Sequence, residues 1–98
     1  MWKQAEHGTT IGQTGSENGI ILEDEEYASS CRITLEKDGH IAPFSITCGV
    51  YGLMVHTTFS TNETEARIKY EGMKKELEAF IQSNDDEGEW CEKFTSKW

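Results

Sequence analysis

Apolar and polar residues alternate strictly over residues 30–36, in the middle of the chain. The apolar positions are Cys31, Ile33 and Leu35. A period of two is typical of a β-strand with one buried and one wetted face. Asp38-Gly39 follows and favours a two-residue type I′ turn. We therefore predict a hairpin that pairs Leu35 with Ala42, Ile33 with Phe44 and Cys31 with Ile46, all on one apolar face.

A second alternating stretch, residues 53–60, predicts a further strand. One set of positions is Leu53, Val55, Thr57 and Phe59, and the other is Met54, His56, Thr58 and Ser60. A two-residue turn at Tyr51-Gly52 pairs Cys48 with Val55, and a four-residue turn over 49–52 shifts the pairing by two residues. Both turns bury the first set. We therefore expect Cys48 and His56 on opposite faces of the sheet.

The pattern changes to a helical period after residue 62. Asn62 precedes Glu65 by three residues, which resembles a capping box. Apolar residues then recur every three or four positions and form a single stripe: Ala66, Tyr70, Met73, Leu77, Phe80 and Ile81. We predict a helix over residues 63–82, about 30 Å long at ~1.5 Å per residue. Gly72 lies inside it, away from the stripe.

The two ends of the chain differ from the middle. Residues 1–19 are rich in Gly and polar residues, which predicts a loop-rich lead-in with at most a short edge strand near residues 9–13. The triplet 20–22 can start a strand, and we expect the acidic run 23–26 to end it at solvent. Residues 83–98 predict an acidic linker followed by an aromatic tail. In that tail Trp90, Phe94 and Trp98 are spaced for one face of a short helix, which packs on its own domain or on a partner.

These elements predict a two-layer α+β fold in one domain, residues 1–98. An antiparallel meander of three or four strands over residues 20–60 would be covered on one face by the helix 63–82, because the apolar stripe and the apolar sheet face need each other. The aromatic tail would form a short C-terminal segment. No internal repeat is visible.

Composition excludes several classes of function. Eighteen acidic and nine basic residues give a net charge of −9, which argues against binding to a phosphate backbone. No apolar run is long enough to span a membrane, and no secretory signal is visible. Three widely spaced cysteines do not suggest a disulfide framework. We therefore expect a cytoplasmic protein with free thiols and no nucleic-acid or membrane partner.

The motifs of common catalytic and cofactor sites are missing from the sequence. The glycines of residues 8–19 are followed by no Lys, as a P-loop requires, and residues 83–94 fail as an EF-hand at positions one and twelve. No Cys or His pair has zinc-ligand spacing. Cys48 and His56 are ruled out as a nucleophile and base because the expected register separates them. We expect no catalytic residue, metal or cofactor.

The polar face of the predicted sheet is the most unusual set of residues. Arg32 lies there among hydroxyls and an imidazole, in a set that comprises Arg32, Ser45, Thr47, His56, Thr58 and Tyr51. A guanidinium fork suits carboxylate or phosphate. The face could hold an anion or polar ligand, dock a protein, or be an ordinary wetted sheet surface, since antiparallel sheets often keep one face in water.

Two functional hypotheses follow. The first is a non-catalytic protein-interaction module of the inhibitor, immunity or adaptor type, because the chain is acidic and has no coherent catalytic set. The second is a small-molecule or anion-binding domain, or a small enzyme, that uses the polar face around Arg32 and His56 with Tyr51. It requires a concave pocket there. Homodimerisation through the open sheet face or a strand edge is compatible with either hypothesis.

Overall fold

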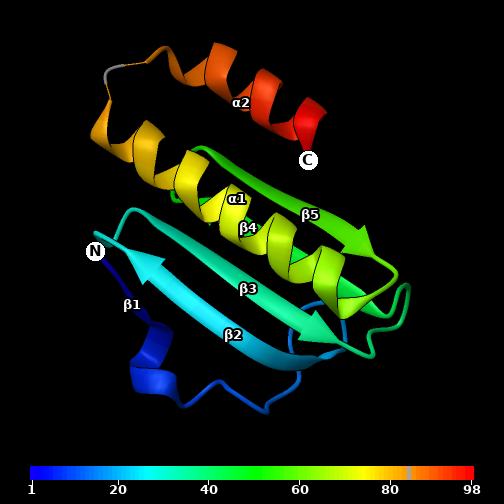
Figure 1. Ribbon diagram of the computed structural model, residues 1–98. Coiled ribbons are helices and arrows are strands. Elements are labelled where there is room, and N and C mark those ends of the chain that lie inside the picture. The colour runs from blue at the N-terminus through cyan, green and yellow to red at the C-terminus, as the bar shows by residue number, and fades with distance from the viewer. Residues whose placement is uncertain (84) are drawn as a thin grey trace.

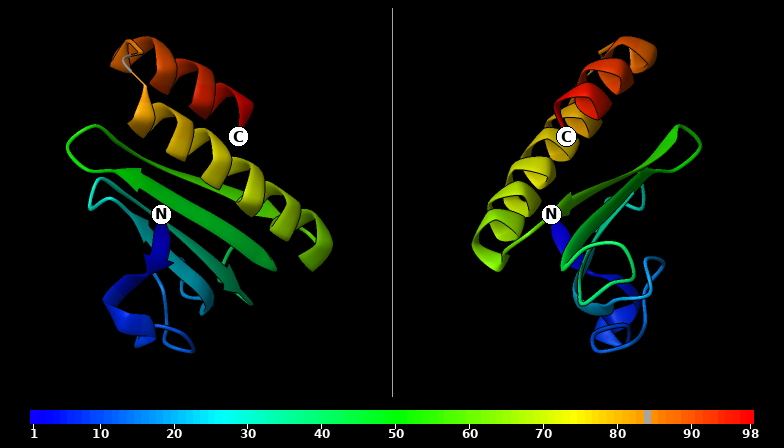
Figure 2. Two further views of the ribbon diagram at one scale, coloured as in Figure 1. Left: turned by 60° about the vertical axis from the view of Figure 1, so that its left-hand side comes forward. Right: turned by 90° about the vertical axis from the view of Figure 1, so that its right-hand side faces the viewer.

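The computed structural model describes residues 1–83 and 85–98 as one five-stranded antiparallel sheet with two helices on the same side (Figures 1 and 2). The strands follow chain order across the sheet: β1 (Trp2–Gln4), β2 (Ile20–Tyr27), β3 (Cys31–Lys37), β4 (Phe44–Val50) and β5 (Met54–Ser60). A short 3₁₀ helix, η1 (Ala5–Gly8), precedes β2, and the helices α1 (Glu63–Gln82) and α2 (Glu87–Lys97) follow β5. The α+β class is confirmed, with a slightly higher strand count than expected.

The core lies between the sheet and α1. Its sheet side comes from β3 and β4, and its helix side is the stripe predicted from the sequence: Cys31, Ile33, Leu35, Ile46, Cys48 and Val50 face Ala66, Tyr70, Met73 and Leu77. Each fully buried aliphatic side chain contributes about 1.5–3 kcal/mol. Helix α1 begins after Asn62, whose side chain accepts a hydrogen bond from the Glu65 N–H at 2.8 Å, as the capping pattern predicts.

The hairpin between β3 and β4 has a longer loop than expected. Leu35 pairs with Ile46, not with Ala42, so the register differs by four residues from the prediction. Residues 38–43 form the connection, in which the Asp38 N–H donates to the Pro43 carbonyl at 2.7 Å. The His40 N–H reaches across to the Glu17 carbonyl at 3.1 Å, so a contact with the N-terminal segment helps to hold the wider loop. An even shift keeps the same side chains inside.

The register between β4 and β5 corrects the sequence analysis. The connection contains three residues, with Gly52 at φ 77° as the second central residue of a turn closed by Leu53 N–H to Val50 C=O at 2.9 Å. Cys48 therefore pairs with His56, and Val50 with Met54. The sequence analysis considered connections of two and of four residues, and each differs by one residue from the actual connection. A difference of one residue places every β5 side chain on the opposite face.

Strand β2 continues through the acidic run at residues 23–26. The sequence analysis expected this run to end the strand at solvent. Each of its four carboxylates has a hydrogen-bonding partner, and three of the four pair with a cation. Arg67 binds Glu23, Arg32 binds Asp24, Lys74 binds Glu25, and the Tyr51 hydroxyl donates to Glu26. The N-terminal edge strand is β1, paired with β2, and residues 9–13 lie in turns instead.

Helix α2 packs on its own chain. The Trp90 ring stacks on Phe80 at 4.1 Å between centroids, and Phe94 is buried against His56. Asp86 caps the helix by accepting from the Glu89 N–H at 2.8 Å. The aromatic spacing noted in the sequence thus extends the helix layer beside α1 (Figure 1).

Candidate functional site

The sheet face opposite the helices, called the open face below, brings together some of the predicted site residues. Strand pairing assigns these side chains to it: Asp24, Glu26, Arg32, Thr34, Glu36, Ser45, Thr47, Gly49, Val55, Thr57 and Phe59. Of the six residues singled out in the sequence, Arg32, Ser45 and Thr47 are therefore on the open face. Tyr51 lies in the β4–β5 turn and reaches Glu26 on that face at 2.6 Å.

His56 and Thr58 lie on the other side of the sheet, under the helices. The one-residue register difference in β5 explains this placement, because it turns both side chains inward. The predicted constellation of guanidinium, hydroxyls and imidazole is thereby split between two faces. Val55, Thr57 and Phe59 take the places on the open face that were assigned to His56 and Thr58.

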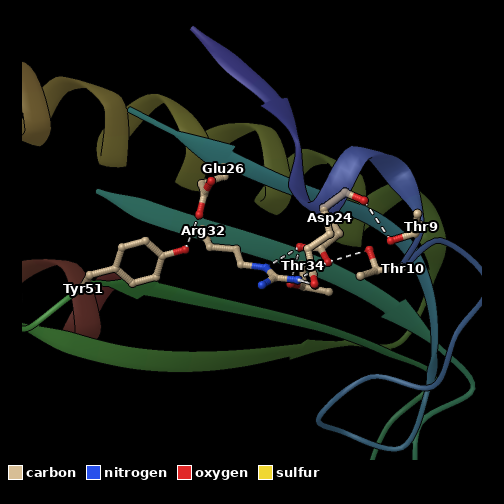
Figure 3. Close-up of polar contacts among 8 residues, drawn as sticks. Thr9, Thr10, Asp24, Glu26, Arg32, Thr34 and Tyr51 are labelled. Carbon is tan, nitrogen blue, oxygen red and sulfur yellow. Dashed lines mark hydrogen bonds and ion pairs between the residues drawn. The ribbon is translucent and has the colours of Figure 1, made fainter. Parts of the chain in front are cut away.

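Arg32 is held by an internal network (Figure 3). Its Nε donates to Asp24 Oδ1 at 2.9 Å and its Nη2 to Asp24 Oδ2 at 2.6 Å, a bidentate pair. Thr10 and Thr34 add hydroxyl donors to the same carboxylate at 2.7 and 3.1 Å. Glu6 accepts from Arg32 Nη2 at 3.3 Å. The Nε–Nη2 edge of the guanidinium fork, which would suit an external carboxylate or phosphate, is thus occupied by Asp24.

The electrostatics of this network favour the ionised pair. Burial raises the pKa of Asp24, but the hydrogen bonds from Arg32, Thr10 and Thr34 outweigh it and lower that pKa below its usual range. The hydrogen bonds that Arg32 donates to Asp24 also raise the pKa of Arg32. Two carboxylates surround one guanidinium, so the cluster offers no excess positive charge to an anion. We conclude that Arg32 positions the N-terminal segment on the sheet.

A hollow lies beside this network on the open face. Its volume is ≈ 460 Å³, and its lining includes Arg32, Thr47, Gly49, Tyr51 and Val55. Gly49 provides the floor, since it has no side chain and a Cβ there would meet only Met54 O at 3.5 Å and Val55 Cγ2 at 3.6 Å. The Tyr51 hydroxyl is a hydrogen-bond donor rather than a base, because burial and the bond to Glu26 raise its pKa to about 12.

Exposed apolar side chains lie at this hollow and farther along β5. Val55 and Tyr51, which line the hollow, are 78% and 52% exposed, and Phe59 is 38% exposed. They lie on or beside the outermost strand, whereas the carboxylates of the open face lie on β2, β3 and η1. The open face therefore has an uncharged half over β4 and β5 and an acidic half over β2.

Cys48 and His56, separated by the sequence analysis, are direct cross-strand neighbours on the helix-covered face. This overturns the geometric reason given against a thiol–imidazole centre, and the chemistry has to be judged from the environment. Cys48 is 1% exposed, and burial raises its pKa to about 12. The His56 Nε2 is buried without a hydrogen-bond partner among the described residues. A neutral, buried thiol is a poor nucleophile.

Glu36 is a buried residue that the sequence analysis missed. Its side chain lies on the open face but is covered by the glycine-rich segment, whose Gly19 and Glu17 N–H groups donate to Oε1 at 3.1 and 3.2 Å. A Cβ on Gly15 would lie 2.4 Å from the Glu36 carboxyl carbon. The glycines of residues 8–19 were the feature of the sequence that could have indicated this contact. They allow the backbone of the N-terminal segment to approach Glu36 closely, and they do not form a phosphate-binding loop.

No protein-family model, no curated protein and no solved structure matches this chain. Within residues 1–83 and 85–98, no cluster of three or more His, Cys, Asp or Glu side chains could hold a metal ion. In the same part of the chain, no helix combines the length and the apolar character that a bilayer crossing requires.

Proposed function

We propose that this chain is a non-catalytic protein-interaction module that docks a partner on the uncharged half of its open face. The observation that carries this proposal is the exposure of apolar side chains on this half: Val55 and Tyr51 line the hollow, and Phe59 lies farther along β5. Exposed apolar groups that lie together beside a polar rim are typical of protein-binding surfaces. Tyr51 adds a rigid aromatic ring of the kind enriched at interface hot spots.

The acidic half of the open face indicates the chemistry of the partner. Glu6 has a 64% exposed side chain next to Arg32, and Glu26 lies between Arg32 and Tyr51. With a net charge of −9, the molecule would attract a positively charged surface and repel an acidic one. The partner we propose has an apolar ridge that fits the hollow and Lys or Arg residues along one side of that ridge.

A small ligand in the same hollow is the second candidate, since ≈ 460 Å³ is within the usual range for ligand pockets. Such pockets enclose most of their ligand. This hollow lies on the surface of a sheet, with Val55 largely exposed at its border. A protein surface, which supplies its own cover, fits this shape better than a free small molecule.

The test of the docking surface compares substitutions of two apolar residues that are both largely exposed. Val55→Lys alters the proposed surface, whereas Ile68→Lys alters an exposed position on α1 with a relative exposure of 69%. The tagged wild-type chain would first capture a stoichiometric partner from the native extract. The purified partner should then bind Ile68→Lys like wild type and Val55→Lys about tenfold more weakly.

Two outcomes would overturn the proposal. Equal binding of Val55→Lys and wild type would show that the partner docks elsewhere. Loss of binding with both variants would show that the effect is the added charge rather than the surface. Circular dichroism and thermal unfolding of both variants provide the folding control, since exposed substitutions usually change stability by less than about 0.5 kcal/mol.

A further inference from the structure

Strand β5 ends the sheet and has an unusual composition for an edge. Its seven residues contain no Asp, Glu, Lys or Arg, and no Pro or Gly. The opposite edge, β1, has only three residues and includes Lys3. Natural sheets protect their edges with charges, prolines or short strands. By that rule β1 is protected and β5 is a strand that can accept another (Figures 1 and 2).

The free backbone groups of β5 belong to its odd-numbered residues. The Met54 carbonyl points toward β4, because it lies 3.5 Å from the position of a Cβ on Gly49. The Phe59 carbonyl points away from β4 and accepts a hydrogen bond from Lys69 Nζ at 2.9 Å. Since hydrogen-bonded and free positions alternate along an antiparallel pair, Val55, Thr57 and Phe59 present their N–H and C=O groups to the outside.

We propose that a second copy of this chain occupies this edge, with the two β5 strands antiparallel around a two-fold axis at Thr57. In this register Val55 of one copy lies opposite Phe59 of the other, and Thr57 lies opposite itself. The apolar side chains therefore match, and about six backbone hydrogen bonds form between the outward-facing residues. Aromatic and β-branched residues are favourable cross-strand neighbours.

The symmetry of the β5 pattern is what selects a second copy as the occupant. Two molecules with a charge of −9 repel each other over most of their surface. Strand β4 is the other strand without Asp, Glu, Lys or Arg, and it is covered on both edges by its neighbours. Pairing of two β5 strands therefore opposes no carboxylates of the strands themselves. The Glu65 carboxylate beside this edge is paired with Lys69 at 3.4 Å. Val55 and Phe59 lie at equal distances before and after Thr57, so each finds an apolar residue opposite it when two identical strands pair. Pairing with an unrelated strand would not require this symmetry.

Helix α2 is compatible with this arrangement. The rings of Phe94 and His56 are 6.1 Å apart, and α2 runs alongside the C-terminal half of α1 (Figure 1). These contacts place α2 over the part of β5 that follows the β4–β5 turn. A two-fold axis perpendicular to the sheet at Thr57 would place the second α2 over the opposite half of the joined strands. All four helices would then lie on one side of a ten-stranded sheet.

Lys69 acts as a competitor for this edge. Its ammonium group bonds the Phe59 carbonyl, which in the dimer would accept from the Val55 N–H of the second copy. Removing Lys69 should therefore strengthen dimerisation, whereas placing two ammonium groups at the axis with Thr57→Lys should weaken it. Lys75→Ala is the matched control, because it removes the same charge from an exposed position of α1.

Light scattering and sedimentation equilibrium over a concentration series test the proposal. The wild-type mass should rise from 11.1 kDa toward twice that value with concentration. Thr57→Lys should raise the dissociation constant about tenfold or more, Lys69→Ala should lower it, and Lys75→Ala should leave it close to wild type. A wild-type chain and a Lys69→Ala variant that both stay monomeric at millimolar concentration would overturn the proposal.

The register is tested by cross-linking in a Cys91→Ser background, because Cys91 is the partly exposed thiol. Directly opposed residues of a hydrogen-bonded antiparallel pair have Cα atoms about 5.5 Å apart, within reach of a disulfide. Thr57→Cys should give a disulfide-linked dimer on mild oxidation, and Val55→Cys should not. Equal cross-linking of the two variants would exclude an axis at Thr57. Both results are independent of any docking on the open face.

Discussion

A buried carboxylate is tolerated when donors surround it, and Asp24 is such a case at the scale of single residues. It is 1% exposed and accepts hydrogen bonds from Arg32, Thr10 and Thr34. Thr10 belongs to the N-terminal segment and Thr34 to β3. The carboxylate therefore joins the N-terminal segment to β3, and Arg32 compensates its charge.

Arg32→Ala should lower the free energy of unfolding by about 2–3 kcal/mol at pH 7, because it leaves the Asp24 charge buried without its cation. The folded-state pKa of Asp24 lies below the ordinary 3.8. The pair is therefore fully stabilising above that pH and loses its contribution as the pH falls through the folded-state value. Urea unfolding from pH 7 to pH 3 should show the variant and wild type converging.

Arg67→Ala is the control for this prediction. Arg67 also binds two carboxylates, Glu63 and Glu23, but its side chain is 45% exposed. Exposed ion pairs contribute less than about 1 kcal/mol. An Arg67→Ala variant that is as destabilised as Arg32→Ala would contradict the importance of burial at Asp24.

Glu36 makes the stability of the protein depend on pH in the opposite direction to Asp24. Burial raises its pKa, the N–H groups of Gly19 and Glu17 only partly compensate, and Oε2 is buried with no hydrogen bond among the described residues. Its folded-state pKa exceeds the ordinary 4.5, so stability is highest below that pH and is lost as the pH rises through the folded-state value. Glu36→Gln should therefore stabilise the protein by about 1 kcal/mol at pH 7.

The advantage of Glu36→Gln should disappear at pH 4, where the wild-type carboxyl is protonated. Chemical denaturation at both pH values measures this. Glu71→Gln removes the same charge from an exposed position of α1 and should show no such pH dependence. A Glu36→Gln variant that is less stable than wild type at both pH values would show that the carboxylate form is required by the loop.

At the scale of elements, periodicity predicted β3, β4, β5 and both helices, and it placed α1 correctly, whereas β1 was missed and β2 was ended before its acidic run. It also assigned the faces of β3 and β4, because the actual register differs from the expected one by four residues, an even number. The connection of three residues at Tyr51–Leu53 inverted β5. A turn dipeptide such as Tyr51-Gly52 does not fix whether two or three residues connect the strands, and only an odd difference exchanges the faces.

The candidate site was predicted only in part for the same reason. Arg32, Ser45 and Thr47 are on the expected face, but the hollow over Gly49 and the exposed Val55 followed from the register of β5. The Arg32–Asp24 pair joins β3 to β2. The sequence analysis did not predict this pair, because it ended the strand that starts at residues 20–22 before the acidic run that contains Asp24. Compensation of those carboxylates by distant cations is a tertiary effect that local charge patterns do not reveal.

Contact between α1 and α2 gives a prediction at this scale. A Cβ on Gly72 would lie 2.8 Å from Trp98 Cη2, so alanine at this position has to displace the Trp98 ring from α1. Alanine normally stabilises a helix interior by about 1 kcal/mol over glycine. Gly72→Ala should therefore bring little gain in the wild type and about 1 kcal/mol in a Trp98→Ala background. A double-mutant cycle by urea unfolding measures the coupling, and equal gains in both backgrounds would contradict the contact.

The whole molecule combines a net charge of −9 with an edge strand that has no charged side chain, and ionic strength separates the effects of the two. Salt screens repulsion between two copies with a charge of −9 each, while the β5 pairing itself uses backbone groups and uncharged side chains. Self-association should therefore strengthen between about 0.05 and 0.5 M NaCl, whereas binding of a basic partner should weaken over the same range. Sedimentation equilibrium gives the first dependence, and titration of the wild-type chain at concentrations below its dimer dissociation constant gives the second. Dimerisation that weakens with salt would show that charged groups form the interface, so β5 would not be its centre. Partner binding that strengthens with salt would show that the acidic half of the open face is not used, because attraction to it must decrease as its charges are screened.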